Sequence, residues 1–168
     1  MGFKMKYIII FLIATNSLLG QFSCDSLVEV KLDKFTKREK IMGRNPIICA
    51  DENQKGIVLL PKIIDDEIYI LIVTNPKKCI DDAKVYFLMD NEQLIRATNR
   101  FKFNCDGLIG IVLGYYGMSA SDGKEFYVRK IKSIRIELKN NFFDYDLTDK
   151  QATELMETLN CLQYKKIK

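Results

Sequence analysis

Apolar and polar residues alternate along most of the chain after residue 56, and this alternation predicts β-strands joined by short turns. The first predicted hairpin pairs Ile57–Ile64 with Glu67–Thr74 around a two-residue turn of aspartates. Its second strand is apolar at consecutive positions, which is typical of a central strand covered on both faces. Pro61 lies in the first strand and donates no N–H, so it predicts a sheet edge at that point.

Two further strand pairs follow. Lys84–Met89 and Glu92–Thr98 flank Asp90-Asn91, residue types that tolerate the left-handed conformation of a tight turn. Phe101–Phe103 and Leu108–Leu113 flank a longer predicted turn. Glycines in the latter strand, such as Gly110, predict a bulge or a close backbone approach.

The last predicted hairpin joins Ser133–Lys139 to Phe142–Leu147 around Asn140-Asn141. A two-residue turn there places apolar side chains on one face and charged side chains on the other. A one-residue slip would mix the two faces, so the pattern predicts the register. We expect the charged face to be solvent-exposed, with a metal or ligand role as the alternative. The predicted cross-strand pairs are Ile134–Leu147, Ile136–Tyr145, Leu138–Phe143, Arg135–Asp146 and Glu137–Asp144.

A C-terminal helix is predicted over residues 149–162. Thr148 is a favourable N-cap, and Gln151 completes a capping box with it. Apolar residues then recur at helical spacing, which predicts one buried face. The sheet offers the large apolar surface against which that face can pack. The stripe consists of Ala152, Leu155, Met156, Leu159 and Leu162.

The predicted fold class is therefore α+β and mainly β. We expect an antiparallel β-meander, with an open sheet as the first choice and a barrel-like closure as the second, and the C-terminal amphipathic helix packed on one face. The 168 residues divide into a signal peptide (1–20), an N-terminal segment (21–32) and a single β-rich domain (33–168). The charged stretch 33–45 is expected to be a solvated connection or a sheet edge.

The N-terminus has the features of a secretory signal. Lys4 and Lys6 precede the apolar run Tyr7–Ala14, which is too short to span a bilayer, and small Gly20 follows. Cleavage there would leave Gln21 as the first residue. This predicts export to the periplasm or the extracellular space.

Lipid attachment at Cys24 is the alternative to simple cleavage, because small Ser23 precedes this cysteine. Gln21 occupies the place where lipoprotein signals carry leucine, which argues against it. Disulfides persist in an exported chain, and five cysteines leave at least one unpaired or lipidated. A lipidated Cys24 would leave three connectivities for the other four, and the alternative is that all are small buried hydrophobes. Those four cysteines are Cys49, Cys79, Cys105 and Cys161.

The composition of the chain limits the kinds of binding and catalysis that it can perform. The chain holds 26 Lys and Arg against 22 Asp and Glu, a net charge of +4, and removal of Lys4 and Lys6 with the signal leaves 24 minus 22, or +2. That balance does not predict nucleic-acid binding. There is no histidine, which excludes Ser-His-Asp and Cys-His catalysis. No cysteine pair has CxxC spacing and no calcium-loop motif occurs, so neither a metal nor a cofactor is expected.

Two kinds of candidate site remain. The acidic clusters Asp65–Glu67 and Asp81-Asp82 are best explained as turn formers at hairpin tips. The stretch Gly114–Gly123 is flexible, aromatic and rich in small residues, as binding loops often are. There Tyr115 and Tyr116 could stack on a sugar or anchor a partner, and their alternative role is to close the core.

Four strings occur in order along the chain: Asp33-Lys34-Phe35-Thr36, IDDEIYILIV, IKSIRIEL and DKQATELMETLNCL. Together they resemble a family of small, uncharacterised exported proteins of Bacteroidetes, over roughly residues 33–162. Lys37 stands where that family usually has glycine. The resemblance implies a secreted protein or lipoprotein and no assigned activity.

Three functions fit these observations. The first is a non-catalytic binding or interaction domain of the periplasm or cell surface, with an envelope protein or glycan as its partner and membrane contact only through a lipid on Cys24. It predicts a contiguous exposed apolar or aromatic patch near Tyr115 and Tyr116. The alternative is a carboxylate-based hydrolase acting on an envelope or glycan substrate, which needs two acids across a cleft and one raised pKa. The third is a structural role in the envelope.

Overall fold

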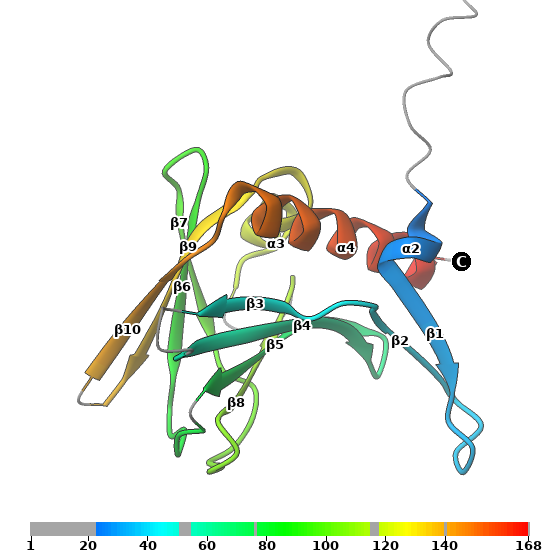
Figure 1. Ribbon diagram of the computed structural model, residues 1–168, viewed down its shortest axis with the longest axis horizontal. Helices are drawn as coiled ribbons and strands as arrows, with labels where there is room; N and C mark the ends of the chain where they lie inside the picture. Colours follow the sequence, from blue (N-terminus) through cyan, green and yellow to red (C-terminus); the bar gives the residue numbers. More distant parts are fainter. Residues whose placement is uncertain (1–22, 51–54, 76, 115–117, 140, 168) are drawn as a thin grey trace, which may run out of the picture.

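The structure is a computed structural model that describes residues 23–50, 55–75, 77–114, 118–139 and 141–167. The predicted signal peptide, residues 1–20, lies outside the described residues. Two antiparallel sheets are covered along one side by a long C-terminal helix, as Figure 1 shows. The elements are α2 (Cys24–Leu27), β1 (Val28–Leu32), β2 (Glu39–Gly43), β3 (Ile47–Ala50), β4 (Gly56–Ile64), β5 (Glu67–Asn75), β6 (Lys84–Met89), β7 (Leu94–Thr98), β8 (Leu108–Val112), α3 (Ala120–Val128), β9 (Ile131–Leu138), β10 (Asn141–Asp146) and α4 (Asp149–Ile167).

The first sheet has the order β1-β2-β4-β5-β8, and β3 also pairs with β4. The predicted β4–β5 hairpin is confirmed: Ile64 faces Glu67 across a turn in which Asp65 and Asp66 have φ of 47° and 61°. Pro61 lies where the outer partner of β4 changes, between the last pair of β3 at Leu59 and the β2 pair at Lys62. Its missing N–H therefore falls at a local edge, as predicted.

Strand β5 is covered on both faces, which confirms its predicted central position. One face contributes Ile68, Ile70 and Ile72 to the main core. On the other face, the Tyr69 ring stacks on Phe101 with 6.1 Å between ring centroids. The ring of Phe101 also fills the place that a side chain at position 110 would need, because a Cβ on Gly110 would lie 2.6 Å from it. This close approach is the reason for glycine inside strand β8.

The second sheet has the order β10-β9-β6-β7. The predicted class, mainly β with a C-terminal helix, is confirmed, but the strands are divided over two open sheets instead of following one meander. The predicted strand Phe101–Phe103 is wrong, because this segment is irregular; its Phe101 packs against β8, and β8 pairs with β5 instead. The predicted two-residue turn after β6 is also wrong: Met89 N–H donates to the Gln93 carbonyl at 2.9 Å, and Glu92 takes the left-handed φ of 64°.

The register of β9 with β10 differs from the prediction by two residues. Ile136 faces Phe143 and Arg135 faces Asp144, and the last pair before the connection is Leu138 with Asn141. The two faces are divided as predicted, since a shift of two residues keeps every side chain on its side of the sheet. The alternating pattern therefore determines which face of the sheet a residue occupies. The length of the turn determines which residues pair across the two strands.

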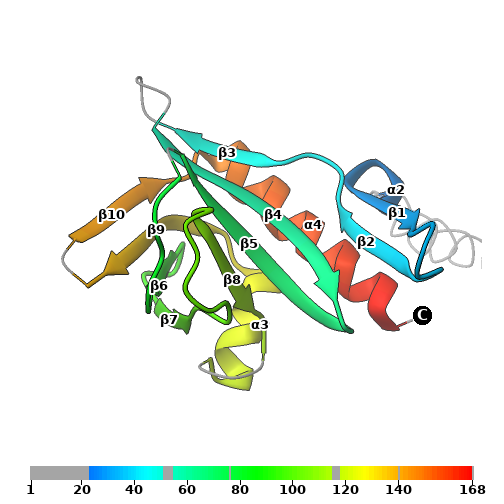
Figure 2. The same cartoon turned by 90° about the horizontal axis from the view of Figure 1, so that it is seen from below.

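Helix α4 begins as the sequence predicts and ends later, at Ile167 instead of residue 162. Thr148 N–H donates to Gln151 Oε1 at 2.8 Å, and Gln151 N–H donates to Thr148 Oγ1 at 3.3 Å, which is the predicted capping box. Leu155 and Leu159 are buried in one cluster with residues of both sheets. Figures 1 and 2 show α4 lying along the first sheet, and its first turns also contact β9 of the second.

Two disulfides are formed. One joins Cys24 of α2 to Cys161 of α4, and the other joins Cys79 to Cys105. The alternative of a lipid on Cys24 is wrong for this structure, because a sulfur in a disulfide cannot also carry a lipid thioether. Cys49 is a free, buried thiol, and burial raises its pKa to about 11. The two bonds are those expected of a protein folded in an oxidising compartment.

Helix α3 begins inside the stretch that the sequence predicted to be a flexible loop. Ser119 Oγ accepts the N–H of Asp122 at 3.0 Å and so caps the helix. Phe126 inserts edge-on against Phe87, with 5.0 Å between ring centroids. Gly123 allows the helix to touch the preceding backbone, since a Cβ there would lie 2.8 Å from Gly114. Among the residues described, no helix is both long and apolar enough to cross a bilayer.

Removing the two disulfides separately should cost different amounts of stability. The sequence separation is 137 residues for Cys24–Cys161 and 26 for Cys79–Cys105. Because loop-closure entropy grows with the logarithm of loop length, the first double serine variant should lose about 1.5 kcal/mol more unfolding free energy than the second. Urea titration of both variants measures the difference, and equal losses would contradict this explanation.

Leu159→Ala should lower the free energy of unfolding by about 2–5 kcal/mol, because it leaves a cavity where α4 meets the sheets. Lys150→Ala is the matched control: Lys150 is exposed on the same helix, so its replacement should change stability by no more than about 0.5 kcal/mol. Chemical denaturation followed by circular dichroism measures both, and similar effects of the two substitutions would count against the packing described for α4.

Candidate functional site

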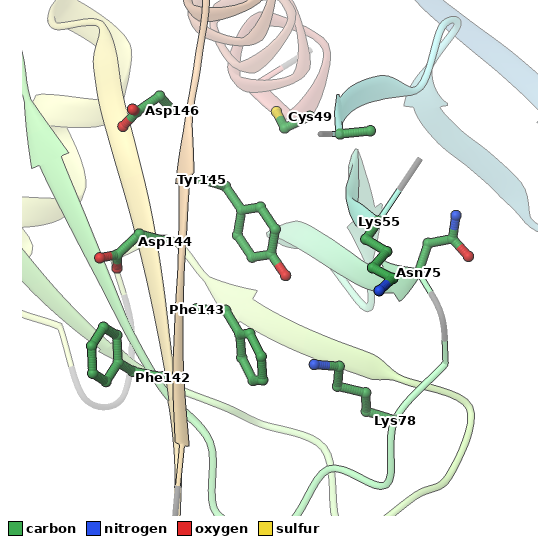
Figure 3. Close-up of a pocket in the computed structure, with 10 residues that line it drawn as sticks. Cys49, Lys55, Asn75, Lys78, Phe142, Phe143, Asp144, Tyr145 and Asp146 are labelled. Atoms are coloured by element: carbon green, nitrogen blue, oxygen red, sulfur yellow. The ribbon is translucent and has the colours of Figure 1, made fainter. Parts of the chain in front are cut away.

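An open cleft of about 850 Å³ separates β10, in the second sheet, from β3 and the adjoining ends of β4 and β5 in the first. Figure 3 shows side chains from both sheets directed into it. Next to the cleft, the start of α4 is joined to β3, where the Gln151 amide donates to the Ile48 carbonyl at 2.6 Å. The lining residues are Cys49, Ala50, Lys55, Asn75, Lys78, Phe142, Phe143, Asp144, Tyr145 and Asp146.

Strand β10 presents its two kinds of side chain to opposite sides. Phe143 and Tyr145 are half-buried and point into the cleft, whereas Phe142 and Asp144 point to the far face (Figure 3). The alternation follows from the two-residue period of a strand. The sequence identified Phe143 and Tyr145 as residues of the apolar face, and the structure leaves both half-buried at the cleft, with Tyr145 also packed against the main core. The cleft therefore has an aromatic wall.

Two lysines, in segments that adjoin β4 and β5 of the first sheet, face this wall. The Lys78 ammonium lies 3.2 Å from the centroid of the Phe143 ring, a cation–π contact. The pKa of Lys78 is lowered by burial and, to a lesser extent, by the charge of Lys55. Figure 3 shows both amino groups directed toward the cleft. Lys55 and Lys78 thus bring two positive charges to one side of the cleft.

Besides the aromatic rings and the lysines, the backbone of β10 also lines the cleft. Within the described residues, β10 pairs with β9 alone. Leu147 N–H donates to the Lys132 carbonyl at 2.8 Å, and this bond sets the alternation along the strand. In an antiparallel pair every second residue bonds the neighbouring strand, and the residues between direct their N–H and C=O groups away from it. The backbone groups of Phe142, Asp144 and Asp146 are therefore aimed at the cleft.

The charged face of the β9–β10 hairpin forms a separate hollow on the far side of the second sheet. Arg135 Nε and Nη2 each donate to Asp144 at 2.6 Å, and Ser133 donates to Asp146. Hydrogen bonds from Arg135 lower the pKa of Asp144, and bonds from Tyr86 and Lys84 lower the pKa of Glu137.

Every carboxyl pKa shift resolved in the described part of the chain, at Asp33, Glu137 and Asp144, is downward. The raised pKa that a carboxylate hydrolase requires of its general acid is thus not among them. Asp65 and Asp66 form the tip of the β4–β5 hairpin with positive φ, as predicted. Asp82 also has positive φ, but Asp81-Asp82 lies in the connection from β5 to β6, which belong to different sheets, so it is not at a hairpin tip. No group of three or more metal-ligating side chains occurs among the residues that the structure describes.

The sequence-predicted binding residues Tyr115 and Tyr116 lie outside the described residues. The residues that line the cleft were missed as a site for two reasons. Phe143 and Tyr145 have the pattern of ordinary core residues, and the sequence does not reveal that their strand is the last one of its sheet among the described residues. Lys55 and Lys78 stand outside the strands, where no periodicity marks them.

Lys78 should react with an acetylating reagent faster than Lys166, an exposed lysine of α4, because its lowered pKa leaves more of the amine neutral at about pH 8. Lys55→Gln removes a neighbouring positive charge, so the pKa of Lys78 should rise part of the way back and its labelling should slow. Mass spectrometry after competitive labelling measures both rates. An unchanged Lys78 rate in Lys55→Gln would show that the two amines do not interact.

Comparison with family models, with curated proteins and with solved structures gives no match for this chain. Function is therefore inferred from the cleft: an aromatic wall, two facing lysines, and a strand that pairs on one side alone among the described residues.

Proposed function

We propose that the chain is an exported, non-catalytic binding domain whose cleft holds an extended acidic peptide segment of a partner protein. The observation that carries this proposal is the edge of β10, whose outward backbone groups share one cleft with Lys55 and Lys78. The two disulfides support a location in the periplasm or outside the cell, where such bonds persist.

The exposed edge supports a peptide as the ligand. A peptide in extended conformation can continue a sheet by bonding to an edge strand, and main-chain bonds then supply affinity while alternate side chains supply specificity. Phe142, Asp144 and Asp146 offer the main-chain donors and acceptors. Phe143 and Tyr145 offer apolar contact on the inner side of the added strand.

The lysines support an acidic sequence. Lys55 and Lys78 lie on the side of the cleft opposite β10, so a strand bonded to β10 would present its side chains near them. A glycan could use the rings and the ammonium groups, but it has no regular N–H and C=O ladder to satisfy the β10 edge. An extended acidic peptide therefore matches the aromatic rings, the lysines and the β10 backbone better than a glycan does.

The hydrolase alternative gains no support from the described residues, because their resolved carboxyl pKa shifts are all downward and Asp144 is held by Arg135. A structural role in the envelope requires no ligand in the cleft. It differs from a binding domain in one measurable respect, since it predicts no response to a soluble peptide.

Titration of the isotope-labelled, disulfide-bonded chain with an eight-residue peptide of alternating glutamate and valine tests the proposal. We expect the amide signals of Phe142, Asp144 and Asp146 to shift in nuclear magnetic resonance spectra. A peptide with lysine in place of glutamate should produce little change. A response to an acidic oligosaccharide alone, or to none of the three probes, would overturn the proposal.

Two substitutions at one position separate the backbone edge from the side chain. Asp144→Ala and Asp144→Pro both remove the carboxylate, but only proline also removes the N–H that points away from β9. Peptide affinity should be about tenfold weaker in Asp144→Pro than in Asp144→Ala, which corresponds to one lost hydrogen bond. Equal affinities would show that the peptide does not add to β10.

A further inference from the structure

A second surface, distant from the cleft, lies at the connection between β1 and β2. This turn is held firmly although it is exposed: Asp33 Oδ1 accepts the N–H groups of Phe35 at 2.9 Å and Thr36 at 2.8 Å, and Lys40 donates to Asp33 Oδ2 at 2.5 Å. Lys37 takes the left-handed φ of 57°. These bonds keep the pKa of Asp33 well below its usual value, so the Asp33 carboxylate remains ionised and the turn keeps its hydrogen bonds in mildly acidic solution. The conformation of the tip is therefore fixed before it meets any partner.

The fixed turn displays an aromatic ring in water. Phe35 is 96% exposed. Behind it, Leu32 is 61% exposed and Val30 is 46% exposed, and both lie on the face of β1 that carries the buried Val28. An apolar row thus runs from the core to the end of the hairpin. Single exposed apolar residues are common on proteins, but a row that ends in a rigidly held phenylalanine marks a surface for contact.

Positive charge surrounds this ring. Residues 31–40 carry five basic side chains and two acidic ones, Asp33 and Glu39, so their net charge is five minus two, or +3. Lys31 and Lys40 form ion pairs with acids of the hairpin. The exposed basic side chains within the turn itself are Lys34, Lys37 and Arg38. The tip therefore combines exposed apolar side chains with positively charged side chains next to them.

The hairpin lies at one end of the first sheet, where its tip and the β4–β5 turn line a shared hollow. It joins β4 through a single residue pair, Met42 with Lys62. Figures 1 and 2 both place it at the end of the molecule opposite β10, so a surface bound at the tip would leave the cleft accessible.

We propose that the β1–β2 tip docks reversibly on an anionic lipid surface, with Phe35 and Leu32 entering the headgroup layer and Lys34, Lys37 and Arg38 contacting the phosphates. Apolar and aromatic side chains beside lysine and arginine are the combination that binds membrane interfaces. Such contact needs no lipid on Cys24, whose sulfur is already in a disulfide. The inference is independent of the peptide cleft.

Flotation with vesicles tests the proposal on the intact, disulfide-bonded chain. Vesicles that contain phosphatidylglycerol should bind the chain, vesicles of phosphatidylcholine alone should not, and salt well above about 0.1 M should weaken binding. Phe35→Ala should weaken binding about tenfold. Lys34→Gln should weaken it about fivefold, whereas Lys34→Arg should not.

Phe103→Ala is the matched control, because Phe103 is 65% exposed on a different segment and its loss should leave vesicle binding unchanged. Equal effects of Phe35→Ala and Phe103→Ala, or equal binding to both kinds of vesicle, would overturn the proposal. Binding of soluble polyglutamate but not of anionic vesicles would also overturn it, since the tip would then recognise an acidic protein surface. Asp144→Pro should not alter vesicle binding, so failure of the peptide proposal and failure of this one are distinguishable.

Discussion

The burial of one face of helix α4 is the interaction on which the rest of the structure depends. Leu155, Leu159 and Leu162 lie in the main core, and the helix contacts strands of both sheets. The Cys24–Cys161 bond ties the start of the described chain to the same helix. Because β10 leads directly into α4, the capped start of the helix holds the end of β10 near β3. Further from the helix, Phe143 and Asp144 line the cleft, and the ammonium group of Lys78 contacts the Phe143 ring there at 3.2 Å.

The turn residues and the alternation of apolar positions determined how much of the fold could be predicted from the sequence. The β4–β5 hairpin was correct in register because Asp65 and Asp66 fill a turn that requires left-handed residues at both positions. The β9–β10 hairpin was correct only in its faces, since apolar alternation has a period of two residues and cannot distinguish registers that differ by two. The assignment of strands to two sheets depends on pairing between segments that are distant in the sequence, such as β6 with β9, and this pairing leaves no local pattern.

The candidate site shows the same limit. The sequence predicted that Phe143 and Tyr145 share the inner face of their hairpin, and the structure agrees. Whether an inward-facing residue lines a core or a cleft depends on what the opposite sheet supplies, which is here the pair Lys55 and Lys78. Neither lysine belongs to a strand. Tertiary structure alone brings these four side chains together.

The side chains of β10 do not protect its edge against pairing with another strand, and this supports the proposal that a peptide binds there. Proteins commonly protect exposed edges with charged side chains directed toward an approaching strand, with proline, or with a covering element. The outer edge of β3 receives such cover where Gln151 bonds the Ile48 carbonyl. On β10 the charged side chain of Asp144 turns away from the cleft and is neutralised by Arg135, so it repels no strand there. Toward the cleft, this strand presents aromatic rings and backbone groups, which are the features that a bound peptide would engage.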